Sequence, residues 1–306
     1  MKEQELLFSI ESILDIHPLE SFKILFDNLK ADHLNPTYIT GRKPFSHKSL
    51  LKAIIYKNLT GLPFLTDLTT ALKNNPSAAI RCGFNILKPL PSVERFSEFL
   101  RDKDNNALQK IRIQLVHELI SRELINGNYL SIDSCPILAK VKENNLKTNV
   151  KDRFNKERSC KGDPDARLGI MVTFSKSKKE ISYFWGYRNH VIIDAKEELP
   201  VWEITKPANV QDSVMFIPVF DLMHKEFHFD IHAVMADAIY DSASILNHII
   251  TTLKAKPRIA LNPRNTKNQP VRNFSKAGNP FCDASLEMLA RGTIYDKVQK
   301  RLSGVM

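Results

Sequence analysis

Apolar side chains recur at spacings of three and four residues through the first part of the chain, which is typical of amphipathic helices. One predicted helix begins after Ser46, whose hydroxyl can cap it, and ends at Gly61. Similar apolar stripes predict further helices at residues 6–14, 22–29, 92–100 and 105–124. The turn residues 126–128, Asn-Gly-Asn, then end the pattern. We therefore predict an all-helical domain at residues 1–128.

After this turn the pattern changes to short runs rich in β-branched and aromatic residues, which predict strands. These runs lie at residues 129–132, 168–174, 181–185, 190–193, 201–205, 232–236 and 257–261. Helical patterns at residues 213–224 and 241–253 separate the later strands. Adjacent strands followed by strands that alternate with helices favour an α/β domain, a mixed sheet with flanking helices, at residues 129–306.

Composition places the chain among globular proteins. It has 306 residues, of which 43% are hydrophobic and 25% charged, so it can bury a core and is not typical of disordered chains. The first ten residues lack the layout of a signal peptide, and no apolar run is long enough to span a membrane. The four cysteines are widely spaced, which predicts free thiols in a cytoplasmic protein.

Positive charge is concentrated in two blocks. Residues 138–190 carry a net charge of +7 and residues 251–306 of +8, whereas the rest of the chain carries −5. Such blocks suggest a surface for a polyanion, although lysine-rich loops are also common without a partner. Charge alone does not distinguish DNA, RNA and an acidic protein. We predict a long mobile loop at residues 140–167, with phosphate contacts from Lys140, Lys142, Lys151, Arg153 and Arg158.

Two aspartates stand at the ends of apolar strands. Asp133 follows Tyr-Leu-Ser-Ile, and Asp237 follows His-Ala-Val-Met-Ala. The carboxyl ends of strands in an open α/β sheet border the crevice where ligands bind, so two such acids could hold hard divalent cations. Paired cations can stabilise both oxygens of an in-line phosphoryl transfer. Alternatively, an aspartate after a strand can simply cap a turn or helix.

The sequences around these acids resemble those of a known family. Tyr-Leu-Ser-Ile-Asp-Ser, ending at Ser134, resembles the first acid motif of the DDE-type transposases of bacterial insertion sequences, and residues 234–242 resemble the second. Ile239 stands where such motifs usually have Gly. Further similar segments, in the same order as in the family, are residues 91–96, 163–167, 185–190 and 203–213.

This resemblance implies an RNase-H-like catalytic domain preceded by a helical DNA-binding domain. It also implies dependence on Mg²⁺ or Mn²⁺ and cleavage and strand transfer of double-stranded DNA at element ends by a homo-oligomer associated with the nucleoid. Asp133 and Asp237 would be catalytic metal ligands. Arg188 and His190 would lie near the DNA backbone, and we expect Asp212 to cap a helix.

The third acid of the family, a Glu on a helix after the last core strand, is not recognisable. Glu287 is the one Glu in the C-terminal region, but its sequence surroundings do not match the family signature. We therefore expect a chain truncated before its Glu-bearing helix. We also expect little or no cleavage activity, because one of the three metal ligands that stabilise the charge of the transition state would be missing.

Three interpretations stay open on the sequence alone. The chain is a DDE transposase of impaired activity, a non-catalytic DNA-binding regulator or competitor from a transposase gene, or an unrelated RNase-H-like nuclease or basic structural protein. A close approach of Asp133 to Asp237 favours the first two interpretations over the third. The sequence does not give the terminal repeat, the target site or the oligomeric state.

Overall fold

The computed structural model describes residues 19–35, 37, 40, 43–175, 178–262, 279–282, 286–289, 292–296 and 301–305. The chain divides into two compact units, residues 1–118 and residues 119–306, and each is considered by itself. The helix predicted at residues 6–14 and seven of the eleven basic residues of the second basic block lie outside the described residues. Within those residues, no helix combines the length and the apolar character needed to span a membrane.

The first unit is helical, as its apolar spacing predicts. Its helices are α2 (Glu20–Asp27), η1 (Asp32–Leu34), α3 (His47–Leu59), α4 (Leu65–Asn74), α5 (Pro76–Cys82), α6 (Val93–Asp102) and α7 (Asn105–Ser121), which continues into the second unit. Ser46 caps α3 as predicted by accepting a hydrogen bond from the Ser49 amide. Helices α4 and α5 fall outside the predicted segments. Their boundaries are nevertheless local, because Asn75 caps α5 and Gly83 ends it in a left-handed conformation.

One apolar core holds these helices together. Phe26, Leu50, Leu68, Leu72 and Phe96 are each almost completely buried in it. They come from α2, α3, α4 and α6, so each helix contributes one apolar face.

The second unit contains a six-stranded sheet. Its strands are β1 (Tyr129–Leu138), β2 (Arg167–Ser175), β3 (Lys178–Asp194), β4 (Leu199–Pro207), β5 (Ala233–Ala236) and β6 (Lys256–Ile259). A separate two-stranded sheet pairs β7 (Gly292–Asp296) with β8 (Arg301–Val305). The two strands predicted at residues 181–185 and 190–193 are parts of the single long strand β3.

The sheet is mixed, with β1 at its centre. Strands β1, β3 and β4 pair antiparallel, whereas β5 pairs parallel to β1 and β6 parallel to β5. The resulting order β4-β3-β1-β5-β6 is the RNase-H-like arrangement, with β2 added along the first part of β3. Helix α8 (Asp212–Phe227) connects β4 to β5, and α9 (Ala243–Asn247), extended by a π-helical turn, connects β5 to β6. The predicted α/β fold class is therefore confirmed.

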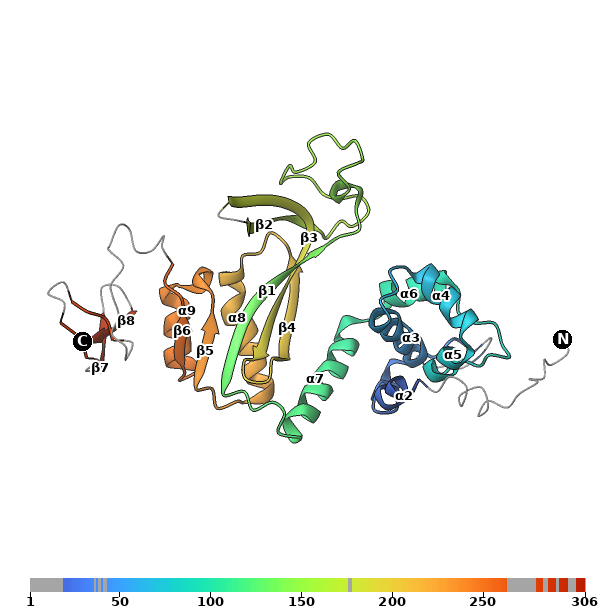
Figure 1. Cartoon of the computed structure of the whole chain (residues 1–306), viewed down its shortest axis with the longest axis horizontal. Helices are drawn as coiled ribbons and strands as arrows, with labels where there is room; N and C mark the ends of the chain where they lie inside the picture. The colour runs from blue at the N-terminus through green and yellow to red at the C-terminus, as the bar shows by residue number, and fades with distance from the viewer. Residues whose placement is uncertain are drawn as a thin grey trace. The chain divides into compact units, whose positions relative to one another are not determined.

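The two faces of the sheet differ in environment. Alternate residues point to opposite faces, and Leu130, Ile132 and Ile192 on one face are buried, where α8 packs against β1, β3 and β4 (Figure 1). We call this side the covered face. The other side, which we call the open face, carries Tyr129 and Asp133, both exposed.

The segment predicted as a long mobile loop is organised. Residues 139–166 leave the end of β1 and return as β2, and Figure 1 shows them in green beyond that end of the sheet. Val141, Cys160 and Ala166 are buried around Trp185 of β3. A side chain at Gly186 would overlap the main-chain carbonyl of Ile137, so glycine is required where the loop leaves the sheet. The segment is a loop, as predicted, but its buried core was not foreseen, because these contacts join residues far apart in sequence.

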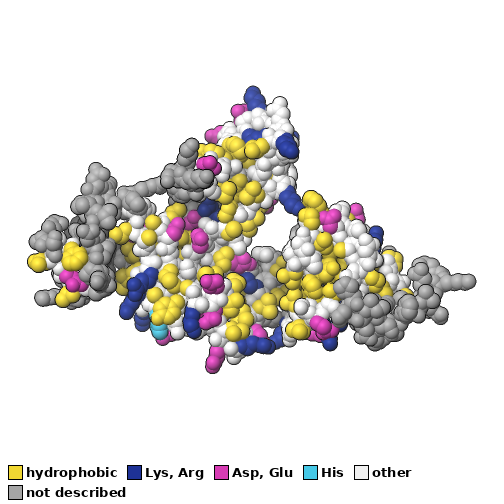
Figure 2. Space-filling model, viewed as in Figure 1, with side chains coloured by type: hydrophobic (Ala, Val, Ile, Leu, Met, Phe, Trp, Pro, Cys, Tyr) yellow, Lys and Arg dark blue, Asp and Glu magenta, His cyan; other side chains and the backbone are white. Residues whose placement is uncertain are grey.

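Strands β2 and β3 also expose apolar side chains. Ile170 lies opposite Tyr183, and Val172 lies opposite Ile181, with between 43% and 54% of each residue exposed. Figure 2 shows hydrophobic surface over β2 and β3, the strands that carry these side chains.

Candidate metal centre

Asp133 lies in the middle of β1, on the open face. It pairs across the sheet with Val191 of β3, and its side chain is exposed while those of its neighbours Ile132 and Leu130 are buried. The strand is therefore held by the core on one side and presents a carboxylate on the other.

Asp237 lies directly after β5, the parallel neighbour of β1. The register pairs Leu130 with Val234 and Ser131 with Met235. Two residues further along, the same register brings Asp237 level with Asp133, and Asp237 keeps an extended backbone there. Adjacent strands lie about 4.8 Å apart. Because side chains alternate between the two faces along a strand, both residues point to the open face. The close approach of the two acids thus follows from the strand pairing.

Each carboxylate uses one oxygen locally. Asp133 Oδ1 accepts a hydrogen bond from the Ser134 amide at 2.7 Å, and Asp237 Oδ1 accepts one from the Ile239 amide at 3.0 Å. Within the described part of the chain, Oδ2 of either residue has no hydrogen bond or ion pair. One oxygen from each acid is therefore available to a cation.

The electrostatics of the pair also favour a cation. Partial burial raises the pKa of Asp237, and the negative charges of Asp133 and Asp212 raise it further, against the effect of the Ile239 amide. A carboxyl group whose ionised form is disfavoured by neighbouring carboxylates is stabilised when a cation binds between them. Oxygen donors of this kind suit Mg²⁺ or Mn²⁺, so the donor set fits the implied metal.

Tyr240 is buried beside these acids. Burial raises the pKa of its phenol, and so do the charges of Asp212, Asp133 and Asp237, in that order. Its hydroxyl is buried without a hydrogen-bond partner among the described residues. Three carboxylates and one buried phenol therefore share a small region at the end of β5.

Asp212 has a role that its sequence position does not reveal. It was expected to cap a helix, but Gln211 occupies the cap position and Asp212 is the first residue of α8. Its Oδ2 forms an ion pair with Arg188 at 2.9 Å, and its Oδ1 lies 3.5 Å from Nδ1 of His190. The aspartate thus joins α8 to Arg188 of β3 and lies beside His190, with which it makes no hydrogen bond.

Arg188 and His190 were expected near a DNA backbone. The His190 side chain is completely buried, so no ring atom is accessible to DNA in this structure. Arg188 is 20% exposed, and its guanidinium binds Asp212, Ser134 and the Ile170 carbonyl. Both side chains therefore make contacts inside the domain.

The five basic residues that were predicted to contact phosphates divide into two groups. Lys140, Lys142 and Lys151 are exposed. Arg153 instead donates to main-chain carbonyls of the loop, including that of Glu143 at 2.7 Å, and Arg158 pairs with the buried Glu143 carboxylate. The two arginines help to build the loop, and the three lysines lie on its surface.

The third acid stays unassigned. Glu287 accepts a hydrogen bond from the Asn279 side chain at 2.8 Å. Among the residues that the structure describes, no group of three His, Cys, Asp or Glu side chains is arranged to hold a metal. Residues 263–278, which follow β6, lie outside that part of the chain.

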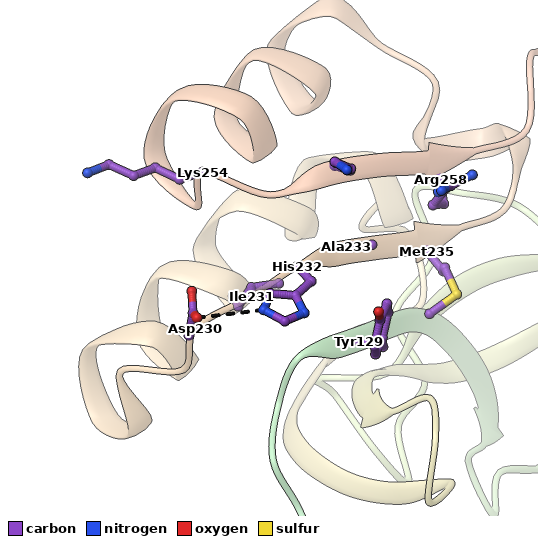
Figure 3. A pocket seen from close by; sticks show the side chains of 9 residues that line it. Tyr129, Asp230, Ile231, His232, Ala233, Met235, Lys254 and Arg258 are labelled. Atoms are coloured by element: carbon purple, nitrogen blue, oxygen red, sulfur yellow. Dashed lines mark ion pairs between the residues drawn. The ribbon is translucent and has the colours of Figure 1, made fainter. Parts of the chain in front are cut away.

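A separate pocket of about 660 Å³ opens at the other end of the same strands (Figure 3). The pocket is lined by Tyr129, Ala233 and Lys256, the first residues of β1, β5 and β6. Asp237 instead follows the last residue of β5, and Asp133 is level with it on β1. His232 projects into the pocket, 3.6 Å from Asp230 and edge-on to the Tyr129 ring. The pocket is therefore distinct from the acid pair.

Comparisons with known proteins bear on this geometry. The family described as "Transposase DDE domain" matches residues 160–298, which include Asp237 but not Asp133. The family described as "Transposase domain (DUF772)" matches residues 7–102, in the helical unit. No curated protein matches the chain.

Among solved structures, the chain is similar to the piggyBac transposase in a cryo-EM structure of its synaptic complex with hairpin DNA. The sequences are 12% identical, the TM-score is 0.37, and the match covers 86% of this chain. It covers 53% of the piggyBac chain, so the present chain spans about half the length of that transposase.

Proposed function

We propose that this chain, which belongs to the DDE-type insertion-sequence transposases, uses Asp133 and Asp237 to bind divalent metal for cleavage and joining of DNA strands. The observation that carries the proposal is the register that brings Asp237 level with Asp133 on the open face. Family membership indicates the reaction class, and the strand pairing supports Asp133 and Asp237 as the residues that would bind the metal.

Asp133 and Asp237 would hold Mg²⁺ or Mn²⁺ through their Oδ2 atoms, with water and phosphate oxygens completing the coordination. A bound ion of this kind stabilises developing negative charge on phosphoryl oxygens and lowers the pKa of a bound water. The protein's part is to keep the two carboxylates level with each other. The sheet does this by holding Asp133 within β1 and Asp237 directly after β5, where its backbone is extended.

The exposed lysines of the 139–166 loop would bind the DNA backbone. Lys140, Lys142 and Lys151 lie on the surface of a loop that starts from β1 a few residues after Asp133. Contacts from lysine to phosphate do not read sequence, so recognition of element ends would belong to other parts of the chain. We assign that recognition to the helical unit, and we predict a homo-oligomer on double-stranded DNA.

A second candidate is a DNA-binding regulator without cleavage activity. It is favoured by one observation, namely that no third carboxylate completes a metal-binding group in the described residues. Such a protein would bind the same DNA and compete with an active transposase.

One assay separates the two candidates. The full chain is incubated with labelled DNA from both flanks of its own gene, with and without Mn²⁺, and binding and cleavage are measured separately. The first candidate predicts weak cleavage, as expected for a site without an assigned third acid, that requires metal and disappears in Asp133→Asn and Asp237→Asn, with binding retained. Binding without cleavage in the wild type would favour the second candidate, and an absence of binding would contradict both.

A further inference from the structure

Arg188 connects three elements of the catalytic domain. From β3, its Nη1 donates to Ser134 Oγ of β1 at 3.2 Å and to Asp212 Oδ2 of α8 at 2.9 Å. Its Nη2 donates to the Ile170 carbonyl of β2 at 2.7 Å. A planar guanidinium can make all of these bonds at once, whereas a lysine ammonium cannot reproduce the same fork.

The bond to Ser134 acts on the residue next to Asp133. Ser134 lies opposite His190, on the covered face, and Asp133 points to the open face. Successive residues of a strand point to opposite faces, so Arg188 does not touch Asp133. It restrains the backbone from which the Asp133 carboxylate projects.

The environment of Arg188 keeps its position defined. The Asp212 side chain is only 8% exposed, and its ion pair with Arg188 is therefore shielded from water. His190 lies on the other side of Asp212 and is completely buried. Burial lowers the pKa of His190 despite the nearby Asp212, so its ring is neutral near pH 7.

We propose that Arg188 is a positioning residue of the metal site, holding β1 through Ser134 so that Asp133 stays level with Asp237. This inference rests on the proposed function, because it requires that the two aspartates bind metal. Outer hydrogen-bond partners of this kind commonly change metal affinity by about tenfold or more when they are replaced.

The test is Mn²⁺ binding by the full chain, followed through the electron paramagnetic resonance signal of free Mn²⁺. Arg188→Lys keeps the positive charge beside Asp212 but removes the fork, and Ser134→Ala removes one branch of it. We expect Arg188→Lys to weaken Mn²⁺ binding about tenfold. Ser134→Ala should weaken it less, and should have no further effect when combined with Arg188→Lys.

The matched control is Arg158→Lys. Arg158 is also a partly exposed arginine paired with a buried carboxylate, Glu143, which is 1% exposed, and it lies in the 139–166 loop of the same domain. Thermal unfolding of every variant shows whether the fold is kept. We expect Arg158→Lys to lower the melting temperature without changing Mn²⁺ affinity.

The outcomes are distinguishable. If Asp133→Asn binds Mn²⁺ as well as the wild type, the proposed metal site is wrong, and the role of Arg188 is wrong with it. If Asp133→Asn loses binding but Arg188→Lys does not, only the role of Arg188 is wrong. Equal losses of affinity in Arg188→Lys and Arg158→Lys would also contradict that role, because general destabilisation would then explain both. If Arg188→Lys does not fold, unchanged Mn²⁺ affinity in Ser134→Ala overturns the proposal.

Discussion

Trp185 of β3 donates its indole N–H to the main-chain carbonyl of Arg153 at 2.8 Å. The ring itself is completely buried, so this side chain of the sheet helps to anchor the loop that carries the exposed lysines. This hydrogen bond links the order of the loop to the integrity of β3.

Replacing Trp185 should therefore loosen the loop. Trp185→Phe removes the hydrogen bond and leaves a gap, at an expected cost of about 2 kcal/mol in the free energy of unfolding. Urea unfolding measures the cost, and limited proteolysis within residues 139–166 should become faster. The control is Trp202→Phe at the chain's other tryptophan, which stacks edge-on with Phe227. Equal proteolysis of this loop in both variants would contradict the proposed anchoring.

Gly186 should tolerate no side chain. In Gly186→Ala the new methyl group would meet the Ile137 carbonyl oxygen, a backbone atom that cannot move without disturbing the pairing of β1 with β3. We expect a loss of about 2 kcal/mol or more in urea unfolding. Gly162→Ala is the control, because its nearest neighbour would be 3.8 Å away, and it should change stability by less than about 0.5 kcal/mol.

The three exposed lysines should determine the salt dependence of DNA binding. Replacing Lys140, Lys142 and Lys151 by Gln should weaken binding at low salt. It should also reduce the slope of log affinity against log salt by about one for each lysine that binds a phosphate in the wild type. Fluorescence anisotropy at several salt concentrations gives this slope. Lys196→Gln, in the turn between β3 and β4, is the control and should leave it unchanged. An unaltered slope in the triple variant would show that this surface does not bind phosphates.

Asp237 should destabilise the metal-free protein at neutral pH. Its pKa is raised on folding, so its contribution to stability is full below the unfolded pKa and is lost as the pH rises through the folded pKa. Asp237→Asn should therefore raise the melting temperature at pH 7 and have little effect near pH 3. Mn²⁺ should stabilise the wild type but not the variant. The exposed Asp230, changed to Asn, serves as the control, and a lower melting temperature in Asp237→Asn at pH 7 would contradict the assigned repulsion.

His190 should make the catalytic domain sensitive to acid. Its pKa is lowered by burial, so the folded protein keeps the ring neutral while the unfolded chain takes up a proton below about pH 6.5. Stability should fall as the pH decreases from 7.5 to 5.5, and His190→Gln should reduce this dependence. Urea unfolding across that range measures the difference. Parallel pH profiles for wild type and variant would exclude His190 as the source.

Much of the fold could be predicted from the sequence because its signals are local. Apolar spacing predicted the helical unit, and runs of β-branched residues predicted the strands and the mixed sheet. The helices α4 and α5 were missed, although the Asn75 cap and Gly83 mark the limits of α5. The single strand β3 was predicted as two because Gly186 and polar residues interrupt its apolar pattern.

The site was predictable only in part. The family resemblance identified Asp133, Asp237 and the segments that contain Arg188 and Asp212. It did not reveal that Arg188 and Asp212 form a partly buried ion pair, because these residues lie 24 positions apart and meet only when α8 packs on β3. The arginines of the basic loop were likewise indistinguishable from its lysines until their main-chain partners were known.

The sequence by itself determined the order of helices and strands, the family and the two candidate acids, since each depends on residue type and spacing along the chain. The tertiary structure decided which residues face each other. Strand register placed Asp237 level with Asp133, and side-chain alternation put Ser134 and Arg188 on the covered face. Register and burial depend on pairing between distant segments. That pairing cannot be predicted from composition and local spacing.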